Sequence, residues 1–179
     1  IAGKKIPVYP GCENPILTPQ IERYAPQKTV LKKWEHDKEF PENRAVAFMQ
    51  EMIHKYPGEI TLICIAPLTN IGLLFAMDPK IPSLLKRIVL MCGSPTYTRY
   101  DGTSETMSAM DKSDLIVLGS KGVIENNALI DPHATKLVYG AEVKEHVTCG
   151  LNVTSRLIMK PEEAEKIFHH PLLEPVLDI

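Results

Sequence analysis

Carboxylate and imidazole side chains gather at two places in the sequence where they could bind a metal or move a proton. His36, Asp37 and Glu39 bring three metal-ligand types close together. Their surroundings are loop-like and highly charged, so a solvated surface is the preferred interpretation. His169 and His170 stand near the expected end of a helix, where a positive charge interacts favourably with the helix dipole. Neither place therefore predicts a catalytic centre.

Four cysteines, Cys12, Cys64, Cys92 and Cys149, are spread along the chain with no C-x-x-C pair among them. Zinc sites and disulfide frameworks use tighter spacings, so the sequence favours free thiols. Cys64 and Cys92 lie inside apolar runs, which predicts that both are buried. Free thiols are typical of a reducing compartment, so we predict a cytoplasmic protein. The sequon Asn152-Val153-Thr154 would then carry no sugar.

Length, charge and missing motifs narrow the classes of function. The chain has 179 residues, of which 44% are hydrophobic and 23% charged, so we predict one globular domain over residues 1–179. A formal charge of -2 provides no positive surface for nucleic acid or an anionic membrane. No apolar run approaches the ~20 residues that cross a bilayer. The motifs G-x-G-x-x-G, G-x-x-x-x-G-K-[ST], G-x-S-x-G and H-E-x-x-H do not occur. We therefore expect neither nucleic acid nor a membrane as a partner.

Short apolar runs alternate with helical patterns, which is typical of an α/β domain with an open, mostly parallel sheet and flanking helices. Ile60–Ile65 is apolar almost throughout, as expected of a strand that is covered on both faces. Ile88–Cys92 shows the same pattern, and His146–Leu151 is a weaker third strand. Ile6–Tyr9 is a further candidate, which Pro7 limits to an edge or to the start of a strand.

Helix signals fill the intervals between these runs. The expected helices are Glu42–Tyr56, ended by Pro57-Gly58; Thr69–Met77; Asp131–Gly140; and one that Pro161-Glu162-Glu163 opens. Thr69 and Asp131 are the expected N-caps of their helices. Thr18–Lys38 is rich in proline and charge, so a long surface loop is expected there. Ser94–Asp114 is polar without periodicity, and a loop of that length is often functional.

Four segments in a fixed order carry a more specific signal than any single pattern. They are Tyr9–Ile16; Pro57–Leu62 with Ala66–Ile71; Ile88–Gly93; and Glu125–Asn127 with Asp131–Ala134 and Gly150–Thr154. Together they resemble the inosine/uridine-preferring nucleoside hydrolase family. That family has a P-G-E-[IV]-T-L strand, a G-P-L-T-N-[IL] helix start, an [IV]-V-L-M-G-G strand end, and an E-[FW]-N-x-x-x-D-P-x-A segment that leads to G-L-D-V-T. One segment alone would be a weak match, but their order and spacing make a strong one.

The resemblance implies hydrolysis of the N-glycosidic bond of a ribonucleoside to free base and ribose. In the family, a Ca²⁺ held by carboxylates binds a water and the 2′- and 3′-hydroxyls of the ribose. An aspartate removes a proton from this water as the water attacks the anomeric carbon. Ca²⁺ prefers oxygen ligands, and it orients and acidifies the water. The resemblance also implies a small-molecule nucleoside substrate and a homo-oligomer, either a dimer or a tetramer.

Four residues take roles from their positions in the family motifs. Ile65 stands where the family offers a backbone carbonyl to Ca²⁺, and an ordinary strand residue is the alternative. Glu125 and Asn127 match residues that bond the ribose hydroxyls, and the alternative is a capped turn before the helix that Asp131 caps. Met91 matches a residue that packs beside the sugar, and the alternative is a buried strand residue. Open α/β sheets bind ligands beyond the carboxyl ends of their strands, so we expect these residues to border one cleft.

The sequence also departs from the family pattern. The family's opening D-x-D-x-x-x-D-D cluster, which supplies most metal ligands and the general base, is expected upstream of Ile1. The later His-Asp pair, which gives another ligand and a neighbour of the leaving group, is expected beyond Ile179. Asn126 replaces an aromatic residue, Cys92 a glycine and Asn152 an aspartate. We therefore interpret the chain as an internal fragment, truncated at both termini and without a catalytic residue of its own. Alone, it is expected neither to hydrolyse nucleosides nor to bind Ca²⁺ tightly. The alternative is a non-catalytic binding or scaffold module without a metal site.

Overall fold

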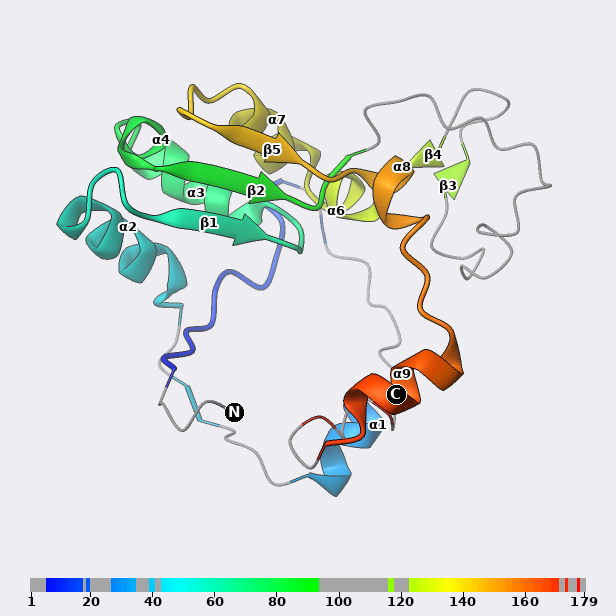
Figure 1. Ribbon diagram of the computed structural model, residues 1–179. Coiled ribbons are helices and arrows are strands. Elements are labelled where there is room, and N and C mark those ends of the chain that lie inside the picture. The colour runs from blue at the N-terminus through cyan, green and yellow to red at the C-terminus, as the bar shows by residue number, and fades with distance from the viewer. Residues whose placement is uncertain are drawn as a thin grey trace.

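The computed structural model describes residues 6–17, 19, 27–34, 39–40, 43–93, 116–117, 123–170, 173 and 177. Its main sheet has the order β1 (Thr61–Cys64), β2 (Arg87–Leu90) and β5 (His146–Thr148), and both strand pairs are parallel. Helices fill the connections between these strands (Figure 1). The predicted fold class, an open parallel sheet with flanking helices, is therefore confirmed.

One face of the sheet is covered by helices. In Figure 1, α3 (Thr69–Met77), α4 (Ile81–Leu84) and α7 (Pro132–Tyr139) lie behind the sheet, and α2 (Ala45–Lys55) packs against α3. The most deeply buried apolar side chains of this layer are Ile53, Leu68, Leu74, Ile81, Leu85, Ile88, Leu90 and Val138. Gly72 lets α3 approach α7 closely, because a Cβ at this position would lie 2.8 Å from Ala134. The core thus lies between the sheet and α3, α4 and α7.

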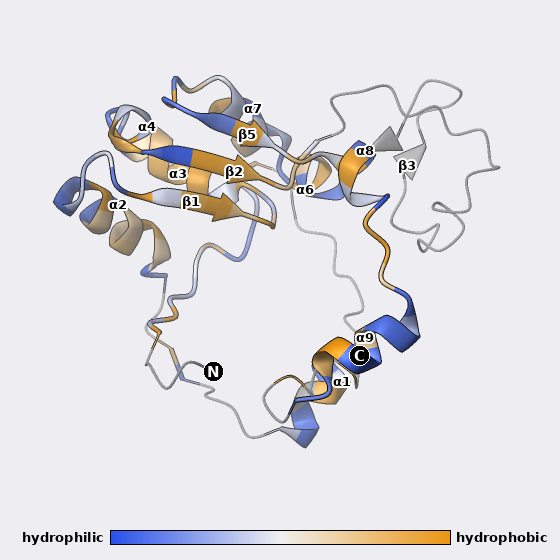
Figure 2. Cartoon of the chain, viewed as in Figure 1, coloured by the Kyte–Doolittle hydropathy of each residue, from blue (hydrophilic) through white to orange (hydrophobic). Residues whose placement is uncertain are grey.

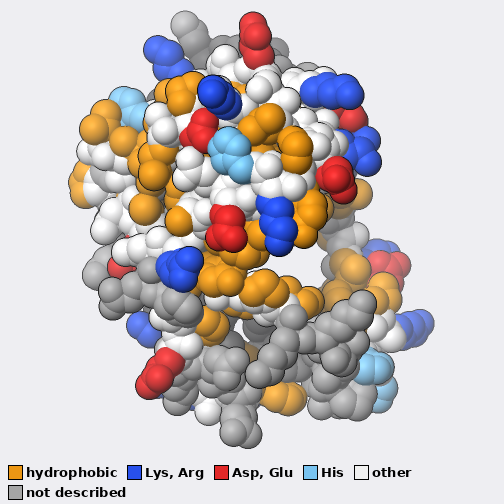
Figure 3. Space-filling view, turned by 90° about the vertical axis from the view of Figure 1, so that its left-hand side faces the viewer, with side chains coloured by type: hydrophobic (Ala, Val, Ile, Leu, Met, Phe, Trp, Pro, Cys, Tyr) orange, Lys and Arg blue, Asp and Glu red, His pale blue; other side chains and the backbone are white. Residues whose placement is uncertain are grey.

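The opposite face of the sheet is open. The side chains of Ile63 and Ile65 are 71% and 76% exposed, although Leu62 and Cys64 on the same run face the helices and are partly or fully buried. Ile63 lies opposite Val89, which lies opposite the exposed Val147. The prediction that Ile60–Ile65 is covered on both faces is therefore wrong. An apolar strand can be covered on both faces, but its sequence does not show whether a second layer is present. Figure 3 shows hydrophobic side chains at the surface, along the lower part of the region that the sheet and its covering helices form.

The first residues of α7 and α3 test the two N-caps that the sequence predicted. Asp131 caps α7 as predicted: its side chain accepts a hydrogen bond from the Ala134 N–H, Pro132 takes the first turn, and Gly140 follows the last residue. Helix α3 does begin at Thr69, but its N-cap is Leu68, so the predicted cap is wrong. The Thr69 hydroxyl instead donates to the Asp131 carboxylate at 2.8 Å. The Thr69 hydroxyl thus makes a tertiary contact with a charged acceptor, and no side chain caps the start of α3.

The remaining described elements are short. They are α1 (Gln27–Val30), the 3₁₀ turn η1 (Leu31–Lys33), β3 (Ile116–Val117) antiparallel to β4 (Val123–Ile124), α6 (Asn126–Ile130), α8 (Leu151–Thr154) and α9 (Pro161–Phe168). The predicted loop Thr18–Lys38 thus contains helical turns, and Ser94–Asp114 lies outside the described residues. Ile6–Tyr9 forms no strand, consistent with the missing N–H of Pro7.

Helix α9 lies apart from the sheet in Figure 1, and it combines hydrophilic and hydrophobic stretches (Figure 2). No residue of α9 is buried, and the segment before it exposes Leu157, Ile158 and Met159. His169 follows its last residue, where the sequence placed a charge near a helix end. Within the described ranges, no helix is both long enough and apolar enough to cross a membrane.

Candidate functional site

The carboxyl ends of the three parallel strands meet in one hydrogen-bonded region. The Met91 N–H donates to the Cys64 carbonyl at 2.8 Å, and the Cys149 N–H donates to the Leu90 carbonyl at 2.8 Å. Beyond the strands, the Leu151 N–H donates to the Gly93 carbonyl at 2.9 Å. Open α/β sheets commonly bind ligands at this edge, so its side chains are the candidates for a functional site.

Glu125 is the most firmly held side chain of this region. Its side chain is buried, with a relative exposure of 4%. Oε1 accepts the Asn127 N–H at 2.7 Å, and Oε2 accepts the N–H groups of Gly93 at 2.8 Å and of Ala128 at 3.0 Å. Glu125 is therefore the N-cap of α6 and also joins this helix to the end of β2. The capped turn that the sequence left as an alternative is therefore present: it begins α6, the helix before the one that Asp131 caps.

Asn127 joins Glu125 to Met91. The Asn127 amide nitrogen donates to the Met91 carbonyl at 2.8 Å and approaches the Met91 sulfur at 3.3 Å. Both N–H groups of the amide are engaged in this way, so its oxygen Oδ1 is the atom that can accept a further hydrogen bond. Asn127 is 8% exposed. The structure therefore brings together three of the four residues that the sequence singled out.

The chemistry that Glu125 and Asn127 can perform depends on their hydrogen-bond acceptors. A carboxylate accepts about four hydrogen bonds. Glu125 has three N–H donors, and the Cys92 thiol also lies within hydrogen-bonding reach of its carboxylate. Asn127 Oδ1 adds a second acceptor on the same short helix. Two buried acceptors are suited to a ligand with two neighbouring hydroxyl donors. The arrangement is therefore one that can bind a vicinal diol.

Ile65 adjoins this group through the backbone. It follows Cys64, whose carbonyl accepts the Met91 N–H, at the end of β1. Its side chain points away from the core and is 76% exposed. The position is consistent with a role for the carbonyl rather than for the side chain, and that role stays a prediction.

The two thiols near the strand ends, Cys64 and Cys92, have raised pKa values. Burial, and then the neighbouring Cys92, raises the pKa of the Cys64 thiol to about 11. Burial, and then the charge of Glu125, raises the pKa of the Cys92 thiol to about 11. Both are free and buried, as predicted from the apolar runs, while Cys12 is a free and exposed thiol. Reaction through a thiolate is therefore disfavoured at Cys64 and Cys92.

Asp131 has a wider role than the helix cap that the sequence predicted. Its side chain is 0% exposed, and besides the Ala134 N–H it accepts the Ile16 N–H at 2.9 Å and the Thr69 hydroxyl at 2.8 Å. Burial acts to raise the pKa of Asp131, but the hydrogen bonds from Ala134, Ile16 and Thr69 outweigh it and lower the pKa. Asp131 therefore joins the N-terminal segment to α3 and α7. No local sequence signal indicates these two distant partners.

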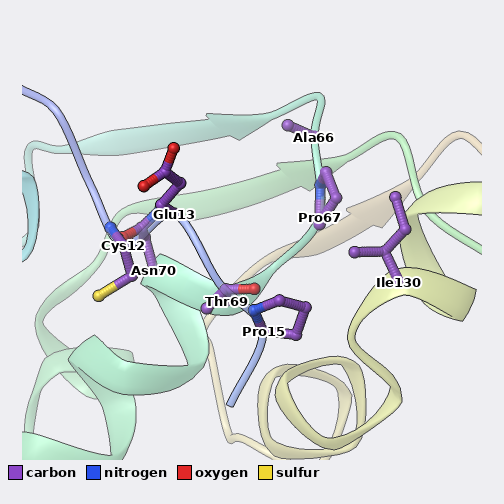
Figure 4. Close-up of a pocket in the computed structure, with 8 residues that line it drawn as sticks. All are labelled: Cys12, Glu13, Pro15, Ala66, Pro67, Thr69, Asn70 and Ile130. Atoms are coloured by element: carbon purple, nitrogen blue, oxygen red, sulfur yellow. The ribbon is translucent and has the colours of Figure 1, made fainter. Parts of the chain in front are cut away.

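A cavity of about 210 Å³ lies beside the site, between the N-terminal segment and the start of α3. It is lined by Cys12, Glu13, Pro15, Ala66, Pro67, Thr69, Asn70 and Ile130 (Figure 4). Ala66 directly follows Ile65, and Ile130 ends the helix that carries Asn127. The Cys12 N–H donates to Asn70 Oδ1 at 2.8 Å, which fixes the near wall. The sequence analysis did not identify this cavity.

Metal ligands do not converge in the described part of the chain. Among the described residues, no group of three or more His, Cys, Asp or Glu side chains could hold a metal ion. His36 and Asp37 lie outside those residues, and Glu39 is exposed. The Glu125 carboxylate is held by three N–H donors, and the Ile65 carbonyl would be a single oxygen ligand. The described residues therefore do not form a Ca²⁺ site by themselves.

The chain is similar to a known protein family over most of its length. Residues 1–176 match the family model described as inosine-uridine preferring nucleoside hydrolase. The non-specific ribonucleoside hydrolase RihC of Salmonella newport is 26% identical over 166 residues, which is 90% of this chain and 47% of that protein. The protein of the same name from Salmonella enteritidis is 25% identical over the same coverage. The chain thus spans about half the length of the curated relatives it matches.

Solved structures agree on the fold. A purine-preferring ribonucleoside hydrolase from Gardnerella vaginalis matches with a TM-score of 0.70 and 19% identity over 97% of this chain and 52% of the other. A plant nucleoside hydrolase matches with a TM-score of 0.63 and 18% identity over 93% of this chain and 48% of the other. At these identities the likeness shows that the fold is shared.

Proposed function

Because the chain belongs to the inosine-uridine preferring nucleoside hydrolase family, we propose that it supplies the ribose-binding edge of a nucleoside N-ribohydrolase. Such an enzyme splits the N-glycosidic bond of a ribonucleoside into free base and ribose. The observation that carries the proposal is the buried pair Glu125 and Asn127, which places a carboxylate and an amide oxygen at the start of one short helix. The 2′- and 3′-hydroxyls of a ribose are neighbouring donors that suit this pair.

The other two residues frame the sugar. The side chain of Met91, beside the Asn127 amide, offers an apolar surface for one side of the ribose ring. The Ile65 carbonyl lies at the end of the neighbouring strand. Hydrogen bonds from Gly93, Asn127 and Ala128 hold the Glu125 carboxylate before a ligand arrives, so binding requires little reorganisation.

The family resemblance brings Ca²⁺ into the reaction, but the described residues do not fit a complete Ca²⁺ site. Ca²⁺ takes about six to eight oxygen ligands, and a tight site needs several carboxylates. The described part of the chain offers one carbonyl, at Ile65, and no free cluster of carboxylates. We expect the 179-residue chain alone to bind Ca²⁺ weakly in calorimetry and to release no base from inosine or uridine.

Titration of the isotopically labelled chain with inosine and 2′-deoxyinosine, followed by NMR, tests the ribose-binding role. Inosine should shift the amides of Gly93, Asn127 and Ala128. The deoxy analogue should bind about ten- to hundredfold more weakly, because it strands a buried acceptor. Glu125→Gln should weaken inosine binding, and the exposed Glu59→Gln is the matched control. Equal binding of both nucleosides would refute the role.

A test of the proposed enzymatic activity requires the longest chain that the gene encodes. Release of free base from inosine or uridine by that chain, lost on chelation of divalent cations, supports the hydrolase. Nucleoside binding without turnover would instead support a non-catalytic binding or scaffold module. A homo-oligomeric assembly and a cytoplasmic location are part of the same proposal, and sedimentation of that chain tests the assembly.

A further inference from the structure

Tyr139 lies outside every sequence motif but is hydrogen-bonded at the centre of the strand ends. It is the last residue of α7, and its ring is 42% exposed. Its hydroxyl donates to the Cys92 carbonyl at 2.9 Å and accepts from Thr148 Oγ1, on β5, at 3.2 Å. The hydroxyl thus connects α7, β5 and the residues that follow β2.

The Cys92 carbonyl belongs to the same peptide unit as the Gly93 N–H. A trans peptide is planar, so its C=O and N–H point in opposite directions, and fixing one fixes the other. The Gly93 N–H donates to Glu125 Oε2 at 2.8 Å. A continuous series of hydrogen bonds therefore runs from Thr148 through Tyr139 and the Cys92–Gly93 peptide to the Glu125 carboxylate.

Gly93 makes this route possible. Its φ of +75° lies in the left-handed region, which side chains other than that of glycine rarely adopt. The turn directs the carbonyl of one peptide to α7 and the N–H of the same peptide to α6. A backbone turned in this way needs partners that hold it, and Tyr139 and Glu125 are the two partners of this peptide unit.

We infer that Tyr139 is a positioning residue for Glu125: it holds the Cys92–Gly93 peptide so that the carboxylate keeps the orientation in which it would accept a hydrogen bond from a ribose hydroxyl. The inference rests on the proposed function for its ligand and on the hydrogen-bond series for its geometry. Hydrogen bonds in series polarise one another, so loss of the Tyr139 hydroxyl should weaken the bond between Gly93 and Glu125 without removing either group.

Tyr139→Phe tests this inference, because it removes the hydroxyl and keeps the ring. The NMR signal of the Gly93 amide should move, and its hydrogen exchange should become about five- to tenfold faster, the size expected for one weakened hydrogen bond. The amides of Thr61–Cys64 should keep their signals, which a general loss of structure would not allow. Thr148→Val should produce a smaller change in the same direction. Tyr56→Phe, at the end of α2, is the matched control.

Inosine binding provides the second readout. Tyr139→Phe should raise the dissociation constant for inosine about three- to tenfold. An unmoved Gly93 amide in Tyr139→Phe, or inosine binding at the wild-type level, would overturn the inference. If Gly93 responds as expected but the wild-type chain binds neither inosine nor ribose, the positioning of Glu125 stands and the proposed function falls.

Discussion

Glu125 and Asp131 are two buried carboxylates that lie close in the sequence and begin successive helices, α6 and α7. Each accepts three hydrogen bonds. The donors of Glu125 are N–H groups of its own helix and of the end of β2. The donors of Asp131 come from its own helix, from α3 and from the N-terminal segment, and its side chain is wholly enclosed.

This difference separates a carboxylate that joins distant parts of the fold from one that we propose binds a ligand. Asp131 joins segments that are distant in the sequence, and no part of it reaches solvent. Glu125 is held mostly by its neighbours and retains a small exposed area. The same local signal, an acidic residue before a helix, therefore predicts both a stability centre and a binding group. The distant partners distinguish them.

The largest expected effect is that of Asp131→Ala. The substitution strands the Ile16 N–H, the Thr69 hydroxyl and the Ala134 N–H, and each stranded group costs about 1–3 kcal/mol. We expect the free energy of unfolding in urea to fall by about 3 kcal/mol or more. An unchanged urea midpoint would show that these donors find water and that Asp131 is only a helix cap.

A pair of isosteric substitutions tests the comparison directly. Glu125→Gln and Asp131→Asn each place an amide among N–H donors, so each should lower the free energy of unfolding by about 1–3 kcal/mol. Only Glu125→Gln should also weaken the binding of inosine. Equal losses of inosine binding in both variants, measured where both are folded, would remove the distinction between the two carboxylates.

Gly93→Ala should have an intermediate effect. The left-handed backbone costs about 1–2 kcal/mol for a residue with a Cβ, while the nearest atom to that Cβ, Tyr139 Oη, lies at an ordinary contact distance of 3.5 Å. The cost is therefore backbone strain rather than a clash. Thermal unfolding should report it, and the strain should disturb inosine binding through Glu125. Gly58→Ala, also at positive φ but remote from the strand ends, is the control that should change stability alone.

The smallest effect is expected at Asp78, the C-cap residue of α3. Hydrogen bonds from His54, at 2.6 Å, and from Gln50 lower the pKa of Asp78 to about 2. A carboxyl group whose pKa is lower in the folded state stabilises the fold above its unfolded pKa of about 3.9 and loses that effect as the pH falls towards 2. Asp78→Asn should flatten the acid dependence of unfolding in this range without affecting inosine binding. An unchanged acid profile would contradict it.

The sequence predicted the regular parts of the fold because their signals are local. Pro57-Gly58 ends α2, Asp131-Pro132 begins α7, and the apolar runs gave the three parallel strands. It failed at Thr69, whose hydroxyl donates to the distant Asp131 and whose helix has Leu68 as its N-cap. It also failed at Ile63 and Ile65, since an apolar run cannot show which of its faces receives a covering layer.

The site could be predicted only in part. Glu125, Asn127 and Met91 were identified through a family resemblance, and the structure brings them together by hydrogen bonds. Their roles towards a ligand stay predictions. Tyr139 could not be identified, and Gly93 appeared only as the last residue of a family segment, because their contacts depend on the packing of α7 across the ends of β2 and β5. No residue near Tyr139 in the sequence indicates its partner.

The hydroxyl of Tyr139 sets an alkaline limit on the ligand-binding edge. Burial raises the pKa of Tyr139, and the Thr148 hydroxyl bond opposes this only in part. The proton that deprotonation removes is the one given to the Cys92 carbonyl, so a tyrosinate would repel that carbonyl instead of holding it. A group whose pKa is higher in the folded state stabilises the fold below its unfolded pKa, about 10, and loses that effect as the pH rises through the folded value. In strong alkali, the strand ends should therefore loosen at Gly93 before the helices on the buried face of the sheet do, and tyrosinate absorbance would mark the onset.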